Sequence, residues 1–233
     1  MARLVLLLGV LFALSPLASD GFNGFTAAQF PVVNDDWPIE PAGWAFSIWG
    51  VIYAWLIAGS LYGALRASDA PDWAAMRPPL AVSLGVGVFW IAAANWSPPL
   101  ATVMIVAMAA GAILALLRAG RTDAVWQRLP VGLYAGWLTA ATGVAIGVMA
   151  SGYGIMGAQA AALVMLPLVL VVALAVQMRR PDTPSYAVAV AWALFGITID
   201  NLTGGSRPVA AMAGVGVALM LGTAVWQRLR AVR

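Results

Sequence analysis

The sequence contains no cysteine, no histidine and no lysine, so its 12 basic residues are all arginine. Without cysteine, the chain can form neither a disulfide nor a reactive thiolate. Without histidine it has no imidazole base, and a zinc site or a histidine-ligated haem is excluded. Without lysine it can form no Schiff base, which rules out a retinal-bearing rhodopsin. We therefore expect a protein that is not an enzyme and that holds no metal and no covalent cofactor.

Charge of either sign is also scarce. Of 233 residues, 63% are hydrophobic and only 9% are charged, which lies far outside the range of soluble globular proteins. A soluble fold of this size could not cover so much apolar surface, so the sequence indicates an integral membrane protein. The net charge of +3 is dispersed along the chain, and we expect no nucleic-acid partner.

The charge-free intervals predict the membrane spans. A helix needs about 20 apolar residues to cross ~30 Å of hydrocarbon, so the intervals 78–117 and 129–178 each hold two helices. Turn signals divide both intervals, at residues 95–99 and 151–154. The sequence predicts an all-α, polytopic membrane helical bundle of about eight transmembrane helices, near residues 3–19, 42–65, 78–96, 99–118, 130–150, 156–178, 184–200 and 208–227.

The arginines predict the orientation of these helices, because cytoplasmic loops retain basic residues. With eight spans and an internal N-terminus, every arginine except Arg207 falls on the cytoplasmic side, and both termini are cytoplasmic. The internal arginines are Arg3, Arg66, Arg77, Arg118, Arg121, Arg128, Arg179, Arg180, Arg228, Arg230 and Arg233.

The first span has a second interpretation. Arg3, the apolar run Leu4–Leu14 and the small residues Ala18 and Ser19 also describe a signal peptide. We expect this segment to be a short, uncleaved first helix.

An aromatic-rich stretch marks the second span. Residues 40–57 hold three tryptophans and a tyrosine. At 100° per residue, Trp44, Trp55 and Tyr62 share one face of the helix, and a second stripe lies on the opposite face. The second stripe comprises Phe46, Trp49, Tyr53 and Ser60. Such a stripe is either helix-packing core or the wall of a flat pocket, and on spacing alone packing is the more common outcome.

The longest predicted loop, residues 20–41, is external and combines acidic with aromatic side chains. Its acidic residues are Asp20, Asp35, Asp36 and Glu40, and its aromatic residues are Phe22, Phe25, Phe30 and Trp37. Its aromatic residues either fold back over the bundle or lie at the lipid headgroups. Trp44 and Trp96 lie near the same boundary, and Trp90 and Trp137 add aromatic surface to the third and fifth spans. Together these residues could form a flat-walled cavity under a lid.

Three motifs follow one another along the chain. The second span contains Pro41-x-x-Trp44-x-Phe46-x-x-Trp49-x-x-x-Tyr53, and the turn after the third span is Asn95-Trp96-Ser97-Pro98-Pro99. The fifth span contains Leu129-Pro130-x-x-x-Tyr134-x-Gly136-Trp137-x-x-x-Ala141-Thr142. In this order, over about residues 1–150, they resemble the motifs of the translocator protein / tryptophan-rich sensory protein family. Ala93 and Ala145 stand where family members usually carry asparagine, which removes two polar groups from the membrane interior.

The resemblance implies a fold and a site. Residues 1–153 would form a five-helix bundle whose long loop caps a cavity, and residues 154–233 would add three helices, as in longer bacterial relatives. The second helix would line the cavity, and Trp137 and Ala141 would face it from the fifth helix, where the small alanine leaves room for a ligand. The predicted ligand-binding residues are Trp44, Phe46, Trp49, Tyr53, Trp96, Trp137 and Ala141.

The family's cavity takes porphyrins, sterol-like lipids and synthetic aromatic ligands. The resemblance therefore implies a sensory or regulatory membrane protein that binds a flat apolar ligand, such as a tetrapyrrole or a lipid, without a covalent bond. Two alternatives stay open: a passive transporter of such a ligand, and an accessory or assembly subunit of a larger, pigment-containing membrane complex. Ion-coupled transport is disfavoured because the spans lack ionisable groups, Asp200 being the nearest case.

These interpretations carry expectations about partners and location. We expect membrane lipid and an apolar small molecule as partners, and a homodimer or a larger membrane complex as the assembly. The multi-pass chain is expected in the bacterial inner (cytoplasmic) membrane.

The predicted topology can be tested by labelling, because the chain has no cysteine of its own. Cysteines introduced singly by Asn34→Cys and Thr122→Cys should react with an impermeant maleimide from opposite sides of the membrane. Reaction of both from one side would contradict eight spans.

Overall fold

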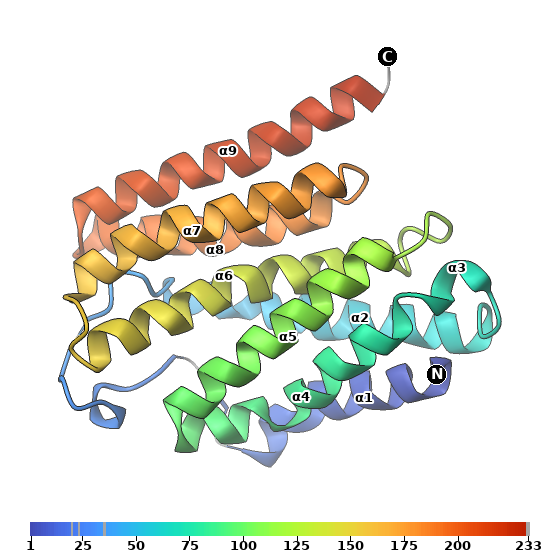
Figure 1. Ribbon diagram of the computed structural model, residues 1–233, viewed down its shortest axis with the longest axis horizontal. Helices are drawn as coiled ribbons and strands as arrows, with labels where there is room; N and C mark the ends of the chain where they lie inside the picture. The colour runs from blue at the N-terminus through green and yellow to red at the C-terminus, as the bar shows by residue number, and fades with distance from the viewer. Residues whose placement is uncertain (20, 23, 35, 232–233) are drawn as a thin grey trace.

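The computed structural model describes residues 1–19, 21–22, 24–34 and 36–231, and every regular element within these ranges is a helix (Figure 1). The predicted all-α fold is confirmed. Asp20 and Asp35 of the long loop, and Arg233 at the C-terminus, lie outside the described residues.

Seven helices of the described chain are long and apolar enough to cross a membrane, and α1 adds a shorter apolar one. The helices are α1 (Ala2–Leu14), α2 (Ile48–Leu65), α4 (Arg77–Trp96), α5 (Pro98–Arg118), α6 (Arg128–Gly152), α7 (Ala158–Arg179), α8 (Pro184–Thr203) and α9 (Arg207–Ala231). A 3-10 turn, Ser15–Ala18, extends α1, and another, Gly43–Ser47, precedes α2. The eight predicted spans correspond to these helices, and α3 (Pro71–Ala74) is a single turn in the connection before α4. The protein is a multi-pass membrane protein.

Prolines explain several of the helix starts. Proline occupies the first turn of α4, α5 and α8, where its missing N–H costs no hydrogen bond and its fixed φ suits a helix. The break at Ser97, which has an extended backbone, lets α4 and α5 form an antiparallel hairpin.

Both termini lie at the same end of the bundle, and the loop between α1 and α2 lies at the opposite end (Figure 1). An even number of crossings produces this arrangement. The helix bounds place the described arginines at the end that carries the termini, with the exception of Arg207 at the start of α9.

The last three helices pack directly on the first five, mainly through α6. Gly136 of α6 lies against the backbone of α8, where an added methyl group would overlap the carbonyl oxygen of Tyr186. The Tyr186 hydroxyl also shares a hydrogen bond of 3.0 Å with the Thr139 hydroxyl. Small residues let helix backbones approach closely in lipid, where packing rather than the hydrophobic effect drives association.

A buried amide pair joins α7 to α9. Gln177 Nε2 donates to Gln227 Oε1 at 2.8 Å, and Gln227 Nε2 donates to the Gln177 carbonyl oxygen at 3.2 Å. Both side chains are buried, and these two bonds join the ends of the two helices, while Gln177 Oε1 has no partner among the described residues.

The close approach of α6 and α8 gives a stability prediction. Gly136→Ala should lower the free energy of unfolding by about 1–3 kcal/mol, because the added methyl group forces the helices apart. Gly222→Ala on α9, where a methyl group would meet nothing within 4 Å, should be neutral or stabilising by up to about 1 kcal/mol. Thermal unfolding of both variants in detergent measures the difference, and equal stabilities would contradict this packing.

Candidate functional site

The aromatic stripe on the second span meets α6 inside the bundle. The rings of Trp49 and Trp137 lie edge to face with centroids 6.1 Å apart, and Phe46 contacts Trp137 in the same way at 5.8 Å. Tyr53 stacks on Trp49 at 5.2 Å, and Phe12 of α1 packs edge-on against both. The stripe is therefore partly packing core and partly the wall of a cavity.

This cavity, the inner cavity, has a volume of about 40 Å³ and lies beneath the long loop. Five helices and the loop contribute to it: α2, α4, α5, α6 and, through Ala193, α8. Its lining residues are Phe22, Gly24, Phe25, Glu40, Pro41, Phe46, Trp49, Trp90, Ile105, Trp137, Ala141, Val144, Ala145 and Ala193.

A larger, more open outer cavity of about 380 Å³ lies beside it, between the end of α1, the start of α2 and the end of α4. Its lining residues are Pro16, Gly21, Phe22, Gly43, Trp44, Phe46, Ser47, Trp49, Tyr53, Trp90 and Ile91. Four aromatic side chains line both cavities: Phe22, Phe46, Trp49 and Trp90. They form the wall that separates the two spaces.

The long loop folds back over the bundle, so the first of the two interpretations of its aromatic residues is correct. Phe25, Phe30 and Trp37 are buried, and Phe22 packs on Trp90 of α4 with ring centroids 4.8 Å apart. Gln29 Nε2 also donates to the Ala94 carbonyl oxygen at 2.9 Å.

The other end of the loop is attached to α8. Asn201 Nδ2 donates to the Pro38 carbonyl oxygen at 2.7 Å. Trp192 Nε1 donates to the Ala45 carbonyl oxygen at 2.8 Å, next to the start of α2. Helix α8 thus helps to hold the loop over the cavity.

Two polar side chains interrupt the apolar lining of the inner cavity. Glu40 lies at the end of the loop, and burial raises the pKa of its carboxyl group to about 7. The backbone N–H of Phe25 lowers this pKa, whereas the charges of Asp200 and Asp36 raise it. The second group is the indole of Trp137, whose Nε1 is buried without a hydrogen-bond partner among the described residues.

The structure places the predicted site residues in three groups. Trp137 and Ala141 line the inner cavity, Trp44 and Tyr53 line the outer cavity, and Phe46 and Trp49 line both. Trp44 is 43% exposed and packs edge-on against Trp192 of α8 at 5.1 Å. Trp96 is 80% exposed and lines neither cavity.

Several lining residues were not among the predicted ones. Phe22, Phe25 and Glu40 come from the loop, whose mixture of acidic and aromatic residues was the available signal. For Trp90 the sequence indicates only aromatic surface on the third span. Ala193 carries no signal in the sequence, because one more alanine in a membrane helix has nothing to distinguish it.

The opposite face of α2 packs at the other end of the bundle. Trp55 Nε1 donates to the Val125 carbonyl oxygen at 2.8 Å, and Tyr62 stacks on Trp126 at 5.7 Å. Both contacts join α2 to the connection between α5 and α6.

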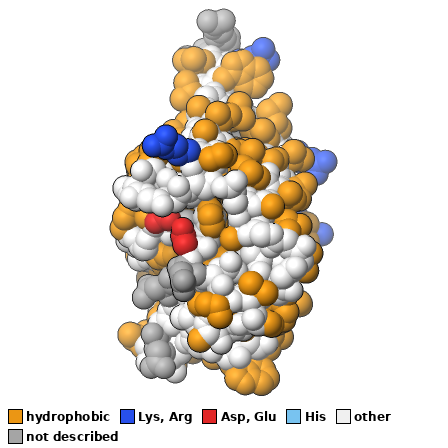
Figure 2. Space-filling view, turned by 90° about the vertical axis from the view of Figure 1, so that its left-hand side faces the viewer, with side chains coloured by type: hydrophobic (Ala, Val, Ile, Leu, Met, Phe, Trp, Pro, Cys, Tyr) orange, Lys and Arg blue, Asp and Glu red, His pale blue; other side chains and the backbone are white. Residues whose placement is uncertain are grey.

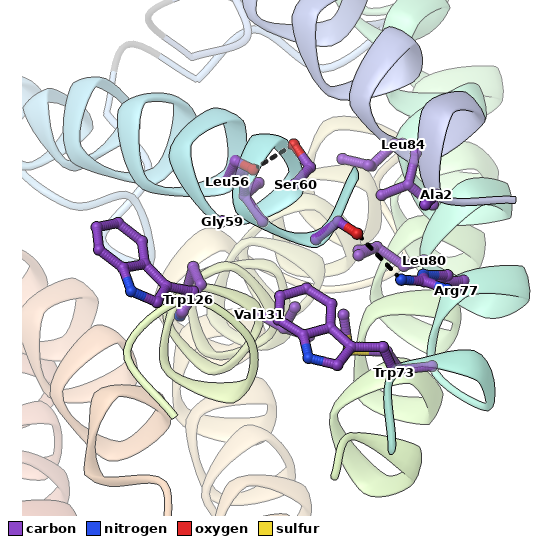
Figure 3. A pocket seen from close by; sticks show the side chains of 14 residues that line it. Ala2, Leu56, Gly59, Ser60, Trp73, Arg77, Leu80, Leu84, Trp126 and Val131 are labelled. Carbon is purple, nitrogen blue, oxygen red and sulfur yellow. Dashed lines mark hydrogen bonds between the residues drawn. The ribbon is translucent and has the colours of Figure 1, made fainter. Parts of the chain in front are cut away.

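A small cleft of about 20 Å³ lies at this end, among α1, α2, α4 and α6 (Figure 3). Arg77 is buried beside it and donates to the carbonyl oxygens of Gly63, Ala67 and Ser68 at the end of α2. Arginine with three such acceptors satisfies the unpaired carbonyls of a helix C-terminus. The cleft is a packing contact between helices, and its volume leaves little room for a ligand.

A sequence model of the family described as TSPO-like protein matches residues 3–226. The match includes the last three helices, which the three motifs do not reach. No curated protein and no solved structure matches the chain. Within the described residues, no group of three or more acidic side chains could hold a metal ion.

The shared aromatic wall gives a prediction about access. Phe22→Ala should join the inner and outer cavities and let a small neutral quencher such as acrylamide reach Trp49, Trp90 and Trp137. Tryptophan quenching should increase relative to wild type, whereas Phe89→Ala, at an exposed position on α4 outside both cavities, should leave it unchanged. The same quenching in both variants would show that Phe22 does not separate the cavities.

Proposed function

The chain belongs to the TSPO-like protein family, and from this premise we propose that it binds a flat apolar ligand, such as a tetrapyrrole or a sterol-like lipid, beneath its long loop. In this proposal the protein is a sensor or regulator of the inner membrane. It has no catalytic role, and the ligand is held without a covalent bond.

One observation carries the proposal: aromatic residues of the second span, α4, α6 and the loop converge on one apolar cavity under the loop. Phe46 and Trp49 come from the second span, and Trp137 and Ala141 come from α6. The flat rings offer stacking surfaces, and each aromatic contact contributes roughly 0.5–1.5 kcal/mol beyond the burial of area. Three or four such contacts support a useful affinity.

The volumes indicate how such a ligand would enter. Pockets for drug-sized ligands enclose about 300–1,000 Å³, whereas the inner cavity holds about 40 Å³ and the outer cavity about 380 Å³. The proposed ligand would enter through the outer cavity and displace Phe22, the one loop residue of the shared wall. The rings of Trp49 and Trp137 would then lie on either side of its path.

The packing below the cavity favours a receptor over a passive transporter. Phe12 and Tyr134 are fully buried on the side away from the loop. The Tyr134 hydroxyl shares a hydrogen bond of 2.9 Å with Ser83, which donates to the Met108 carbonyl oxygen at 2.7 Å. A ligand that passed from the cavity through this layer would have to break these hydrogen bonds. An accessory subunit, the remaining alternative, would copurify with other chains from its native membrane.

The proposal can be tested with protoporphyrin dimethyl ester, a flat porphyrin without free carboxylates, added to the purified chain in detergent. Trp49→Ala should weaken binding by roughly tenfold because it removes a stacking wall. Ala141→Leu should abolish binding by filling the cavity, at a cost in stability of about 1–3 kcal/mol. Tryptophan fluorescence quenching by the porphyrin measures both effects.

The matched control is Trp55→Ala, which removes a tryptophan from the opposite face of α2. Its affinity should equal that of the wild type. Equal losses in Trp49→Ala and Trp55→Ala, or unchanged binding in Ala141→Leu, would mean that the aromatic residues are packing core only.

A further inference from the structure

Among the described residues, one carboxyl group lines the inner cavity, that of Glu40, and none of their cationic side chains pairs with it. The ion pairs found among the described residues join Asp182 to Arg128 and Arg180, at the opposite end of the bundle. Around Glu40 the lining is apolar, apart from the backbone of the loop. A carboxylate without a counter-ion in such surroundings is costly.

The surroundings of Glu40 increase its negative potential. Asp36 of the loop and Asp200 of α8 are close enough to act on its charge. Figure 2 looks onto this end of the bundle and shows a small acidic patch on a surface that is otherwise mostly apolar or uncharged, with one basic group nearby. Arg207 begins α9 at the same end and forms no ion pair with an acidic side chain that the structure describes. The helices α4, α5 and α6 contribute no charged side chain to the cavity lining.

A second, independent group in the same cavity lacks a partner. Trp137 is only 2% exposed, and its indole Nε1 has no acceptor among the described residues. Buried polar groups nearly always have a hydrogen-bond partner. The cavity therefore presents one uncompensated carboxyl group to whatever fills it, and one of its wall residues holds an indole N–H without a partner among the described residues.

We propose that the inner cavity selects flat apolar molecules that carry a protonated amine, with the amine paired to Glu40 and the ring system against Trp49 and Trp137. This inference rests on the proposed function and narrows its ligand class. A cation would supply the missing counter-charge of Glu40. Ligands with carboxylates would meet the repulsion of Glu40, Asp36 and Asp200.

The proposal predicts that binding depends on pH. Because the pKa of Glu40 is about 7, its carboxyl group is ionised at pH 8 and mostly protonated at pH 5.5. An amine would lose its partner as the pH falls through this range, whereas a neutral ligand would not. The folding stability of the empty protein depends on pH in the opposite direction to amine binding. The raised pKa of Glu40 contributes stability that is fully present below the ordinary carboxyl pKa and is lost as the pH rises through about 7. A bound cation would offset that loss.

The test uses three probes of the same shape on the full chain in detergent: 2-naphthylmethylamine, 2-naphthalenemethanol and 2-naphthoate. At pH 8 the amine should bind roughly tenfold more tightly than the alcohol, because hydrogen bonds to charged groups are the stronger ones, and the naphthoate should bind least. At pH 5.5 the preference for the amine should shrink to about twofold or less. Isothermal titration calorimetry measures all three affinities.

Glu40→Gln keeps the size of the side chain and removes its charge. It should abolish both the preference for the amine over the alcohol and the pH dependence of that preference. Asp69→Asn, an exposed position in the connection before α3, is the matched control and should behave as the wild type. The wild-type pH series tests the proposal even if Glu40→Gln does not fold.

The outcomes separate the two proposals. Equal binding of amine and alcohol at pH 8, with both blocked by Ala141→Leu, would overturn the preference for a cation and leave the ligand cavity intact. Tighter binding of the naphthoate would also overturn it. Binding of none of the three probes, and of no porphyrin ester, would overturn the proposed function itself.

Discussion

The contact between the aromatic stripe of the second span and α6 is the interaction on which the rest of the site depends. Trp49 and Trp137 meet edge to face, and this pair fixes how far α2 and α6 can separate. Such a wide contact leaves a gap beside Ala141 and Ala145, where small side chains cannot fill the space. The loop covers this gap from one end, and the layer of Phe12 and Tyr134 closes it from the other. A cavity at this place follows from combining large residues with small ones at one interface.

Much of this fold could be predicted from the sequence, because the membrane limits the possibilities. Only helices satisfy their own backbone groups in lipid, so charge-free intervals and turn signals were enough to find each span. The facing of Trp49 and Trp137 followed from the family motifs. The position of Trp96 did not follow from them: it belongs to the turn motif, yet its side chain is exposed. The roles of Phe22 and Ala193 could not be predicted either, because they depend on how distant segments pack together.

Of the three C-terminal helices, α8 is part of the site. Trp192 and Asn201 of α8 hold the start of α2 and the end of the loop by hydrogen bonds, and Ala193 lines the inner cavity. Gly196 leaves room for Pro41 and Ala45 against the same helix. The position of Glu40, next to Pro41, is therefore set partly by residues more than 140 positions away in the sequence.

The amide pair between Gln177 and Gln227 has a consequence for how the protein is made. The two residues are 50 positions apart, so the partner of Gln177 is synthesised only with the end of the last helix. Until then the described partner of the Gln177 Nε2 group is the Arg180 carbonyl oxygen, at 3.4 Å, and the shorter bond to Gln227 favours pairing once α9 arrives. Folding would thus finish with the pairing of Gln177 and Gln227, which sets the register of α9 against α7. A chain that ends before Gln227 would lack the hydrogen bond that joins the end of α7 to the end of α9.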